Sequence, residues 1–284
     1  MILIADSGST KTDWRLIDEE NKIHQFKTTG INPYFHSSES ITEALTKELL
    51  PNIKFEIRNL KFELFFYGAG CSSDEKCNIV KRGLQSCFSK PIIEVEHDLL
   101  AAARALCGHD KGIAAILGTG SNSCYYNGKD IIENVVSLGY VLGDEGSGAY
   151  MGKKLIQYYL YKELPEDLDK IFFEKYKLTK DEVLENVYKK PNPNRYLASF
   201  SPFLQHNLSH HFIAKLVYDS FSDFFEHHIC KYAEHKQVKM HCTGSVGFYF
   251  ANILRQVATD RAVAIDKITE SPIAGLTLYH LNER

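Results

Sequence analysis

Two stretches of this chain combine glycine, hydroxyl and charged side chains in a spacing that suits phosphate binding. Residues 2–5 are apolar, and residues 6–12 follow with the sequence Asp-Ser-Gly-Ser-Thr-Lys-Thr. Apolar residues resume at Trp14 and Leu16, so the turn is predicted to join two antiparallel strands. Its backbone N–H groups and hydroxyls can face phosphate oxygens, and Asp6 at the strand tip can hold a hydrated Mg²⁺. Hairpin turns use the same residue types, so this copy alone leaves both interpretations open.

A second copy of the pattern favours phosphate binding. Residues 112–117 are another apolar run, residues 118–123 another hydroxyl-rich turn, and the strand that follows ends at the hairpin dipeptide Asn127-Gly128. The first turn is not a Walker A loop, because that motif opens a helix and this turn is predicted to return into a strand.

Asp98 lies where an apolar strand at 92–96 gives way to an alanine-rich helix at 99–106. Ligands of α/β sheets gather at the carboxyl ends of strands, so a carboxylate there can act as a general base for a sugar hydroxyl. A helix N-cap is the other interpretation, and the position alone leaves the two equal.

Residues 139–152 form the most specific run of the chain, and its first ten residues place four glycines around the acids Asp144 and Glu145. Glycine lets the backbone approach a ligand closely, and paired acids bind sugar hydroxyls well, although such a run can also be a plain turn. Asn32 lies in a Gly/Asn/Pro loop at 29–34 that can line a cleft or simply turn the chain.

The remaining elements form an alternation of strands and helices. We expect a helix capped by Ser37 or Ser38, a helix capped by Asp74, and a mostly helical region at 153–234 that is interrupted by a loop at 191–194. A strand at 238–242 then leads into a third glycine turn at 243–247, and a terminal helix follows residues 271–276.

Composition limits the function classes. The 284 residues can form one or two domains, and the net charge of −3 with mixed signs gives no basic surface for nucleic acid. No apolar run approaches the about 18 residues that span a membrane, and no signal segment precedes the first strand, so we expect a cytoplasmic protein. Seven scattered cysteines without a Cys-x-x-Cys pair predict reduced thiols, and adjacent histidines at 210–211 and 227–228 predict surface or packing roles rather than a metal site.

The run Leu-Gly-Asp-Glu-Gly-Ser-Gly at 142–148, with the turns at 8–12 and 118–122, resembles the N-acetylglucosamine kinase and BadF/BadG-type ATPase family of the acetate and sugar kinase/Hsp70/actin superfamily. The resemblance spans nearly the whole chain. It implies an α/β fold of two ribonuclease-H-like, actin-like ATPase domains around a nucleotide cleft. The first would comprise residues 1–109 joined by a C-terminal helix at about 273–284. The second would comprise residues 110–272 with a helical insertion, and hinges are expected near 107–112 and 270–275.

The family's activity implies an ATP-dependent kinase acting on an amino sugar, with N-acetylglucosamine at its 6-hydroxyl as the leading substrate and Asp98 as the catalytic base. Asp6 would bind Mg²⁺ through water. The residues implied to bind ATP and its phosphates are Asp6, Gly8, Ser9, Thr10, Lys11, Thr12, Gly118, Thr119, Gly120, Thr243, Gly244, Ser245 and Gly247. Those implied to bind the sugar are Asn32, Ser121, Asn122, Asp144 and Glu145.

Other functions stay open at this point. N-acetylmuramate or glucosamine could be the substrate, since Tyr34 stands where the family often has another aromatic and the helical region carries no motif. A BadF-type ATPase that activates a partner dehydratase would need two cysteines near the hinge to hold an iron–sulfur cluster, and neither Cys107 nor Cys124 is obviously presented there. A nucleotide-regulated binding protein would need Asp98 to be only an N-cap. We expect a homodimer.

Overall fold

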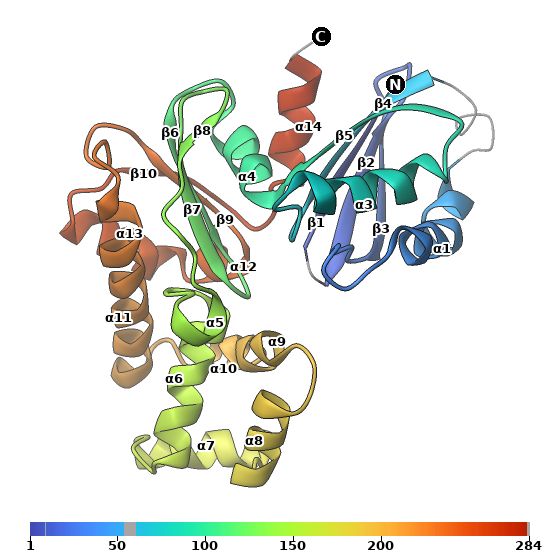
Figure 1. Ribbon diagram of the computed structural model, residues 1–284. Coiled ribbons are helices and arrows are strands. Elements are labelled where there is room, and N and C mark those ends of the chain that lie inside the picture. The colour runs from blue at the N-terminus through green and yellow to red at the C-terminus, as the bar shows by residue number, and fades with distance from the viewer. Residues whose placement is uncertain (9, 54–60, 283–284) are drawn as a thin grey trace. The chain divides into compact units, whose positions relative to one another are not determined.

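The computed structural model describes residues 1–8, 10–53 and 61–282, and the chain divides into two compact units. Unit 1 comprises Met1–Gly108 with Pro272–Arg284, and unit 2 comprises His109–Ser271. Each unit contains one five-stranded sheet with helices packed on it (Figure 1). The sequence predicted two domains, and whether these units are domains that fold separately stays a prediction. In the described part of the chain, no helix is long and apolar enough to cross a membrane.

The sheet of unit 1 has the order β3-β2-β1-β4-β5. Its strands are β1 (Ile2–Ser7), β2 (Lys11–Ile17), β3 (Ile23–Thr29), β4 (Lys61–Gly68) and β5 (Lys90–His97). The first three pair antiparallel, and β4 and β5 run parallel to β1. The predicted hairpin at the first turn is therefore confirmed.

Helices cover both faces of this sheet. They are α1 (Ser38–Glu48), a 3₁₀ helix (Leu50–Asn52), α3 (Asp74–Gln85), α4 (Asp98–Cys107) and α14 (Ile273–Asn282). Strand alternation sends Leu3 and Trp14 to the face under α1 and α3, and sends Ile2 and Ile4 to the face under α4 and α14. The helix caps differ in one place from the sequence prediction, because Ser73 rather than Asp74 accepts the hydrogen bond that caps α3. Asp74 is the first helical residue, where a carboxylate favours the helix dipole.

The sheet of unit 2 repeats the arrangement of unit 1, in the order β10-β9-β6-β7-β8. Its strands are β6 (Gly112–Leu117), β7 (Ser121–Tyr126), β8 (Ile131–Glu133), β9 (Met240–Thr243) and β10 (Ile265–Thr269). Again three strands pair antiparallel and two run parallel to the first. The duplication predicted from the two turns is confirmed, and with it the actin-like α/β fold.

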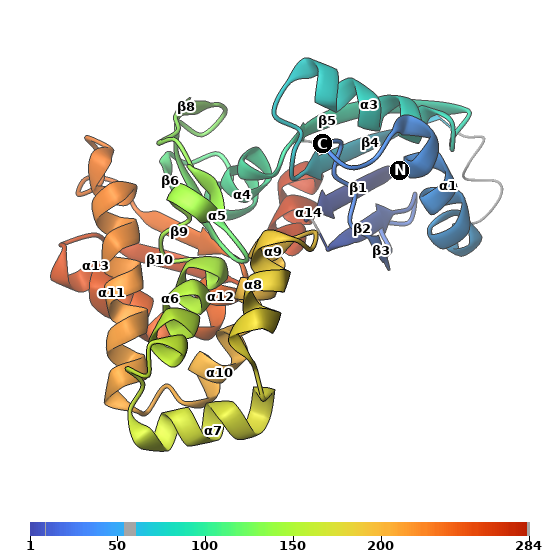
Figure 2. The ribbon, with the colours of Figure 1, turned by 60° about the horizontal axis from the view of Figure 1, so that its bottom comes forward.

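Most helices of unit 2 belong to the predicted helical region, and α7 to α10 gather at one end of the unit (Figure 2). They are α5 (Gly139–Leu142), α6 (Gly148–Leu160), α7 (Glu166–Tyr176), α8 (Lys180–Tyr188), α9 (Pro193–Ala198), α10 (Ser201–His206), α11 (His211–His227), a 3₁₀ helix (Ile229–Lys231), α12 (Ser245–Tyr249) and α13 (Ala251–Asp260). The loop predicted at 191–194 is shorter than expected. Pro193 begins α9, because proline suits the first helical position and Asn192 makes the turn at φ 58°.

Candidate active site

The first predicted phosphate turn joins β1 to β2. The N–H of Gly8 donates to the Lys11 carbonyl across the turn, at 3.0 Å. Asp6 lies opposite Asp13 in the strand register, and the Lys11 ammonium is 3.0 Å from the Asp13 carboxylate. Because opposed residues share a face, this side of the hairpin carries two acids and a cation. Asp13 is a neighbour of the predicted Mg²⁺ ligand Asp6 that the sequence analysis missed. Its spacing of two residues from Lys11 along one strand was a readable signal, because residues i and i+2 of a strand share a face.

The Thr12 hydroxyl does not take the phosphate role predicted for it. Thr12 is fully buried, and its hydroxyl is 2.8 Å from that of Ser7 and donates to the Thr29 carbonyl at 3.1 Å. The physical reason is strand alternation, which places Thr12 on the core face with Trp14 and opposite to Asp6. Ser9 lies outside the described residues. Thr10 is exposed at the turn, where its predicted phosphate contact stays a prediction.

Asn32 follows β3 and is 9% exposed. Its side-chain oxygen accepts a hydrogen bond from the Tyr34 N–H at 2.9 Å, and Gly70 packs against the same amide. A residue larger than glycine at position 70 would collide with this oxygen. Because the oxygen is already used, the Asn32 amide is oriented to offer its N–H₂ group to a ligand as a donor.

Asp98 is the first residue of α4, and the N-cap is His97. The Nδ1 atom of His97 accepts a hydrogen bond from the Leu100 N–H at 3.2 Å, which is the capping interaction. The alternative that Asp98 serves as the N-cap is therefore wrong. Burial raises the pKa of the Asp98 carboxyl, and the charge of His97 and nearby backbone N–H groups limit the rise. A carboxylate with a raised pKa is a better proton acceptor, as a general base requires.

The second predicted phosphate turn joins β6 to β7 in unit 2. The N–H of Gly118 donates to the Gly120 carbonyl at 3.0 Å. The first N–H groups of α6 close on the same turn, with Gly148 donating to Gly118 at 2.8 Å and Ala149 donating to Thr119 at 3.0 Å. The turn and the start of α6 thus form one hydrogen-bonded piece.

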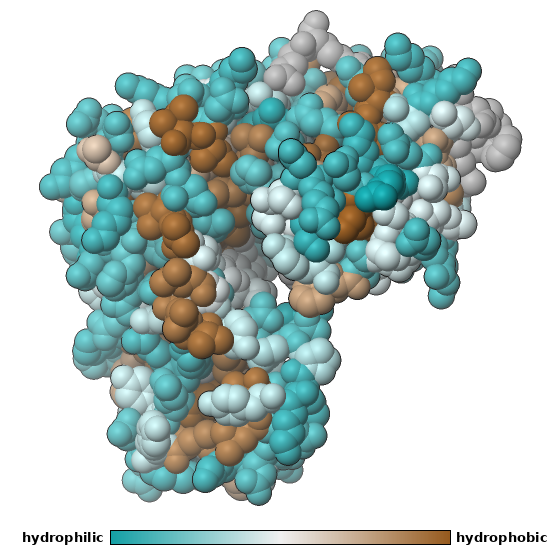
Figure 3. Space-filling model, in the orientation of Figure 1, coloured by the Kyte–Doolittle hydropathy of each residue, from teal (hydrophilic) through white to brown (hydrophobic). Residues whose placement is uncertain are grey.

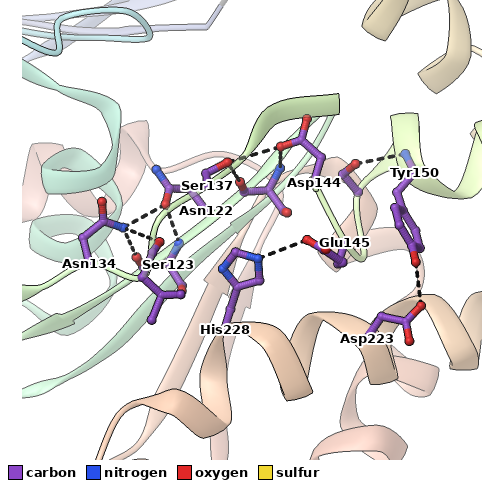
Figure 4. A network of polar contacts seen from close by, with 12 residues as sticks. Asn122, Ser123, Asn134, Ser137, Asp144, Glu145, Tyr150, Asp223 and His228 are labelled. Carbon is purple, nitrogen blue, oxygen red and sulfur yellow. Dashed lines mark hydrogen bonds and ion pairs between the residues drawn. The ribbon is translucent and has the colours of Figure 1, made fainter. Parts of the chain in front are cut away.

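Asp144 lies directly beside this turn, as Figure 4 shows. Its Oδ1 atom accepts hydrogen bonds from the Ser121 N–H at 3.3 Å and the Ser137 hydroxyl at 3.4 Å, and a Cβ on Gly120 would lie 2.9 Å from Oδ2. Burial raises the pKa of the Asp144 carboxyl, and the two hydrogen bonds limit the rise. Asp144 also has a left-handed backbone with φ 57°, which is uncommon for a residue with a side chain. Sites that store such strain are often functional.

Asn122 is oriented by its neighbours in the same network (Figure 4). Its Oδ1 atom accepts from the Ser123 N–H at 2.9 Å and from the Asn134 amide at 3.0 Å. Asn122 therefore presents N–H donors outward, as Asn32 does in unit 1. The sequence did not indicate a role for Asn134, because its partner Asn122 is 12 residues away and the two meet only through the pairing of β7 with β8.

Glu145 points in a different direction from Asp144 and meets His228, a residue that the sequence analysis assigned to packing. The His228 Nε2 atom is 3.2 Å from Glu145 Oε2, and the imidazole is almost fully buried. In the first turn of α6, the Tyr150 hydroxyl donates to Asp223 at 2.7 Å. The two contacts join this segment to α11 and to the residue that caps its C-terminal end, and neither partner is near in sequence.

The third glycine turn shares a pocket of about 360 Å³ with the second turn. Gly118 and Thr119 line one side, Ser245 and Val246 another, and residues of α9 and α10 such as Gln205 complete it. Gly244 has φ 114°, and a side chain there would collide with the Leu117 carbonyl. Gly247 packs on the sulfur of Cys242, and the Thr243 hydroxyl accepts from Thr269 at 3.1 Å. The structure thus brings two of the predicted nucleotide turns together.

The chain is similar over its whole length to a solved structure. A candidate N-acetylglucosamine kinase from Porphyromonas gingivalis has 43% sequence identity and a TM-score of 0.93, with 99% of each chain covered. The present chain belongs to the N-acetylglucosamine kinase family. This sugar kinase is accordingly an ATP-dependent carbohydrate kinase, as the resemblance of its motifs implied.

Two further structures share the fold of this sugar kinase at low identity. A candidate N-acetylglucosamine kinase from Chromobacterium violaceum has 15% identity and a TM-score of 0.75, with 98% of each chain covered. A ROK family glucokinase from Streptomyces griseus, solved with glucose and AMPPNP, has 14% identity and a TM-score of 0.57, with coverage of 98% of this chain and 97% of that chain. No family model and no curated protein sequence matches the chain.

Proposed function

We propose that the protein transfers the γ-phosphate of ATP to the 6-hydroxyl of N-acetylglucosamine. One observation in the structure carries the proposal: Asp144, an acceptor suited to a sugar hydroxyl, is hydrogen-bonded to the backbone of the second phosphate turn. A carboxylate fixed beside a phosphate turn can hold an acceptor sugar close to the group it receives. The name of the 43% identical relative supports the choice of amino sugar.

Asp98 is proposed as the base that takes the proton of the attacking hydroxyl. Its raised pKa and its position one residue inside the N-cap of α4 support this role. Asn32 would bind a sugar oxygen through its N–H₂ group. Most of the rate would come from positioning and from neutralising the phosphate charge.

Mg²⁺ is proposed to be held by Asp6 through water, with Asp13 beside it. The two opposed carboxylates are oxygen ligands of the kind that Mg²⁺ prefers, and Mg²⁺ keeps several waters when it bridges phosphates. Within the described ranges, no group of three or more His, Cys, Asp or Glu residues that could hold a metal ion is found. Bound there, the ion would supply charge neutralisation at the phosphates.

The nucleotide is proposed to lie with its phosphates at Gly118, Thr119 and Gly120 and its nucleoside in the neighbouring pocket. Backbone N–H groups of a glycine turn suit phosphate oxygens, and the apolar walls given by Val246 and Phe250 suit a base. Ser121, Asn122 and Glu145 are proposed for the sugar side of the same unit.

The test is a panel of acceptors. Purified protein with ATP and Mg²⁺ should release ADP when N-acetylglucosamine is added, and the product should carry phosphate at position 6 by ³¹P NMR. Turnover with N-acetylmuramate or glucosamine alone would change the substrate but keep the reaction class. If no sugar of the panel, glucose included, stimulates ADP release, the proposal is wrong.

The BadF-type alternative requires accessible cysteines. Cys107 is 5% exposed and Cys124 is fully buried, so neither thiolate is presented for a cluster shared between subunits. A brown, iron-containing anaerobic preparation would favour that alternative.

A homodimer in the cytoplasm is also proposed. Large apolar side chains lie exposed on unit 2, where Figure 3 shows brown side chains along one face. The large side chains that are exposed on unit 2 include Val136, Leu138, Val141, Leu142, Tyr161 and Tyr188. Exposed apolar surface of this kind is typical of protein interfaces. Light scattering after gel filtration would give the mass, and a monomer at all concentrations would contradict the dimer.

A further inference from the structure

Among the residues that the structure describes, the ring of His228 has one polar partner, the Glu145 carboxylate. The imidazole Nε2 atom is 3.2 Å from Oε2, and the two side chains are 4% and 15% exposed. The other ring nitrogen, Nδ1, is buried and has no hydrogen-bond partner among the residues that the structure describes. Because a carboxylate can only accept, Nε2 carries a proton in this arrangement. The contact is therefore a hydrogen bond between largely buried groups, and loss of either group leaves the other without a partner.

His228 is the C-cap residue of α11, and its imidazole packs against that helix. Its ring stacks on Phe224, with centroids 5.1 Å apart and an interplanar angle of 26°, and its backbone N–H donates to the Phe224 carbonyl at 2.9 Å. The donor that meets Glu145 consequently lies at the C-terminal cap of α11, next to Phe224 of the unit 2 core (Figure 4).

Glu145 belongs to the short segment 143–147 between α5 and α6, which also contains Asp144 in its left-handed conformation. The segment is fastened on one side through the Asp144 carboxylate to Ser121 and Ser137. On the other side it is fastened through Glu145 to His228. A strained backbone persists only where its surroundings determine it, so each fastening helps to keep Asp144 in place.

We propose that His228 is a positioning residue for the sugar. Through Glu145 it holds the segment 143–147 so that the Asp144 carboxylate stays where a sugar hydroxyl can donate to it. His228 does not itself touch the sugar. The inference rests on the proposed role of Asp144 in sugar binding, and it adds to that role a residue 84 positions further along the chain than Asp144.

Three substitutions test the proposal. H228F keeps an aromatic ring to stack on Phe224 but removes the donor, and H228Q places an amide N–H₂ near the position of Nε2. H227F is the matched control, because His227 is the exposed last residue of α11 and directly precedes His228. If H228F does not accumulate as folded protein, H228N replaces it, because the asparagine amide is one methylene shorter than that of glutamine and does not reach Glu145.

Steady-state kinetics provide the first measurement. H228F should raise the KM for the sugar about tenfold, the size expected for loss of one hydrogen bond to a charged group, while the KM for ATP and kcat change by less than about twofold. H228Q should restore most of the sugar KM, and H227F should behave as the original protein. An unchanged sugar KM in H228F, or equal rises of both KM values without rescue by H228Q, would overturn the proposal.

Hydrogen exchange of the amides at 144–147 provides a second measurement that needs no turnover. The Ser147 N–H donates to the Asp144 carbonyl, so its exchange reports whether the segment keeps its conformation. Exchange should be faster in H228F, or in H228N where it replaces H228F, than in H228Q and H227F. Equal exchange in the three variants would refute the positioning role. If the original protein phosphorylates no sugar, the proposed function fails, and this comparison still decides whether His228 holds the segment.

Discussion

The buried histidine of the C-terminal helix should make the stability of unit 1 depend on pH. His280 is 2% exposed, and its Nε2 atom is 2.9 Å from the Tyr67 hydroxyl. Arg104 donates to the same hydroxyl oxygen at 2.7 Å, so the hydroxyl proton points to His280 and the imidazole accepts it. Protonation of Nε2 would remove the acceptor of the Tyr67 hydroxyl proton, and it would place a second positive charge near the Arg104 guanidinium. Burial, followed by the Arg104 charge, lowers the pKa of His280 to about 4.

The sign and size of the effect follow from linkage. An unfolded histidine binds a proton below about pH 6.5, whereas the native His280 binds one only near pH 4, so the unfolded state binds more protons between these values. Stability from this group is therefore complete above about pH 6.5 and falls as the solution becomes more acidic. The loss should be about 1 kcal/mol at pH 5.5, and about 3 kcal/mol once the native histidine is also protonated.

The assay uses the single tryptophan of the chain. Trp14 is buried in the sheet of unit 1, so its fluorescence during urea unfolding reports on that unit. H280Q keeps an acceptor for Tyr67 but cannot titrate, and it is the matched control for all other groups that titrate in this range. As the pH falls, the unfolding free energy of the original protein should decrease relative to that of H280Q, by about 1 kcal/mol at pH 5.5. Parallel curves for the two proteins from pH 7.5 to 4.5, or an NMR titration of His280 centred near pH 6.5, would refute the reasoning.

Four further outcomes are expected at the active site. Asp98→Asn should lower kcat by about 10² or more, as for loss of a general base, with ATP affinity within a few-fold; loss of nucleotide binding would instead make Asp98 structural. Gly120→Ala should raise the sugar KM several-fold, because the added methyl would displace the Asp144 carboxylate, and an equal rise in the KM for ATP would contradict this. ATP hydrolysis should be slow without sugar and rise strongly with it, whereas a constant background would argue against sugar-linked closure. Chelation of Mg²⁺ should abolish turnover reversibly, and activity that survives it would remove the metal from the proposal.

Several features of the fold could be predicted from the sequence because their causes are local. The alternation around Trp14 and the apolar run at 112–117 follow from strand geometry, and the duplicated glycine turns then predict two related sheets. The residues that cap the helices were harder to predict from the sequence. Position alone made Asp98 equally an N-cap or a base, and only the structure shows that the preceding His97 accepts the capping hydrogen bond.

The candidate site likewise has features that the sequence indicates and features that only the structure shows. The sequence by itself determined the residue types that can do the chemistry, namely the glycine turns, Asp98 and the acids of the run at 139–152. Each has an ordinary structural use when taken alone, and it is their duplication and order along the chain that indicated a site. The tertiary structure decided which of them can act and with what partners. It turned the Thr12 hydroxyl into the core, placed Asp13 beside Asp6, and set His228 against Glu145. These contacts join residues brought together by strand pairing and helix packing, and no local pattern records them, because side-chain direction depends on the surface that each element finally buries.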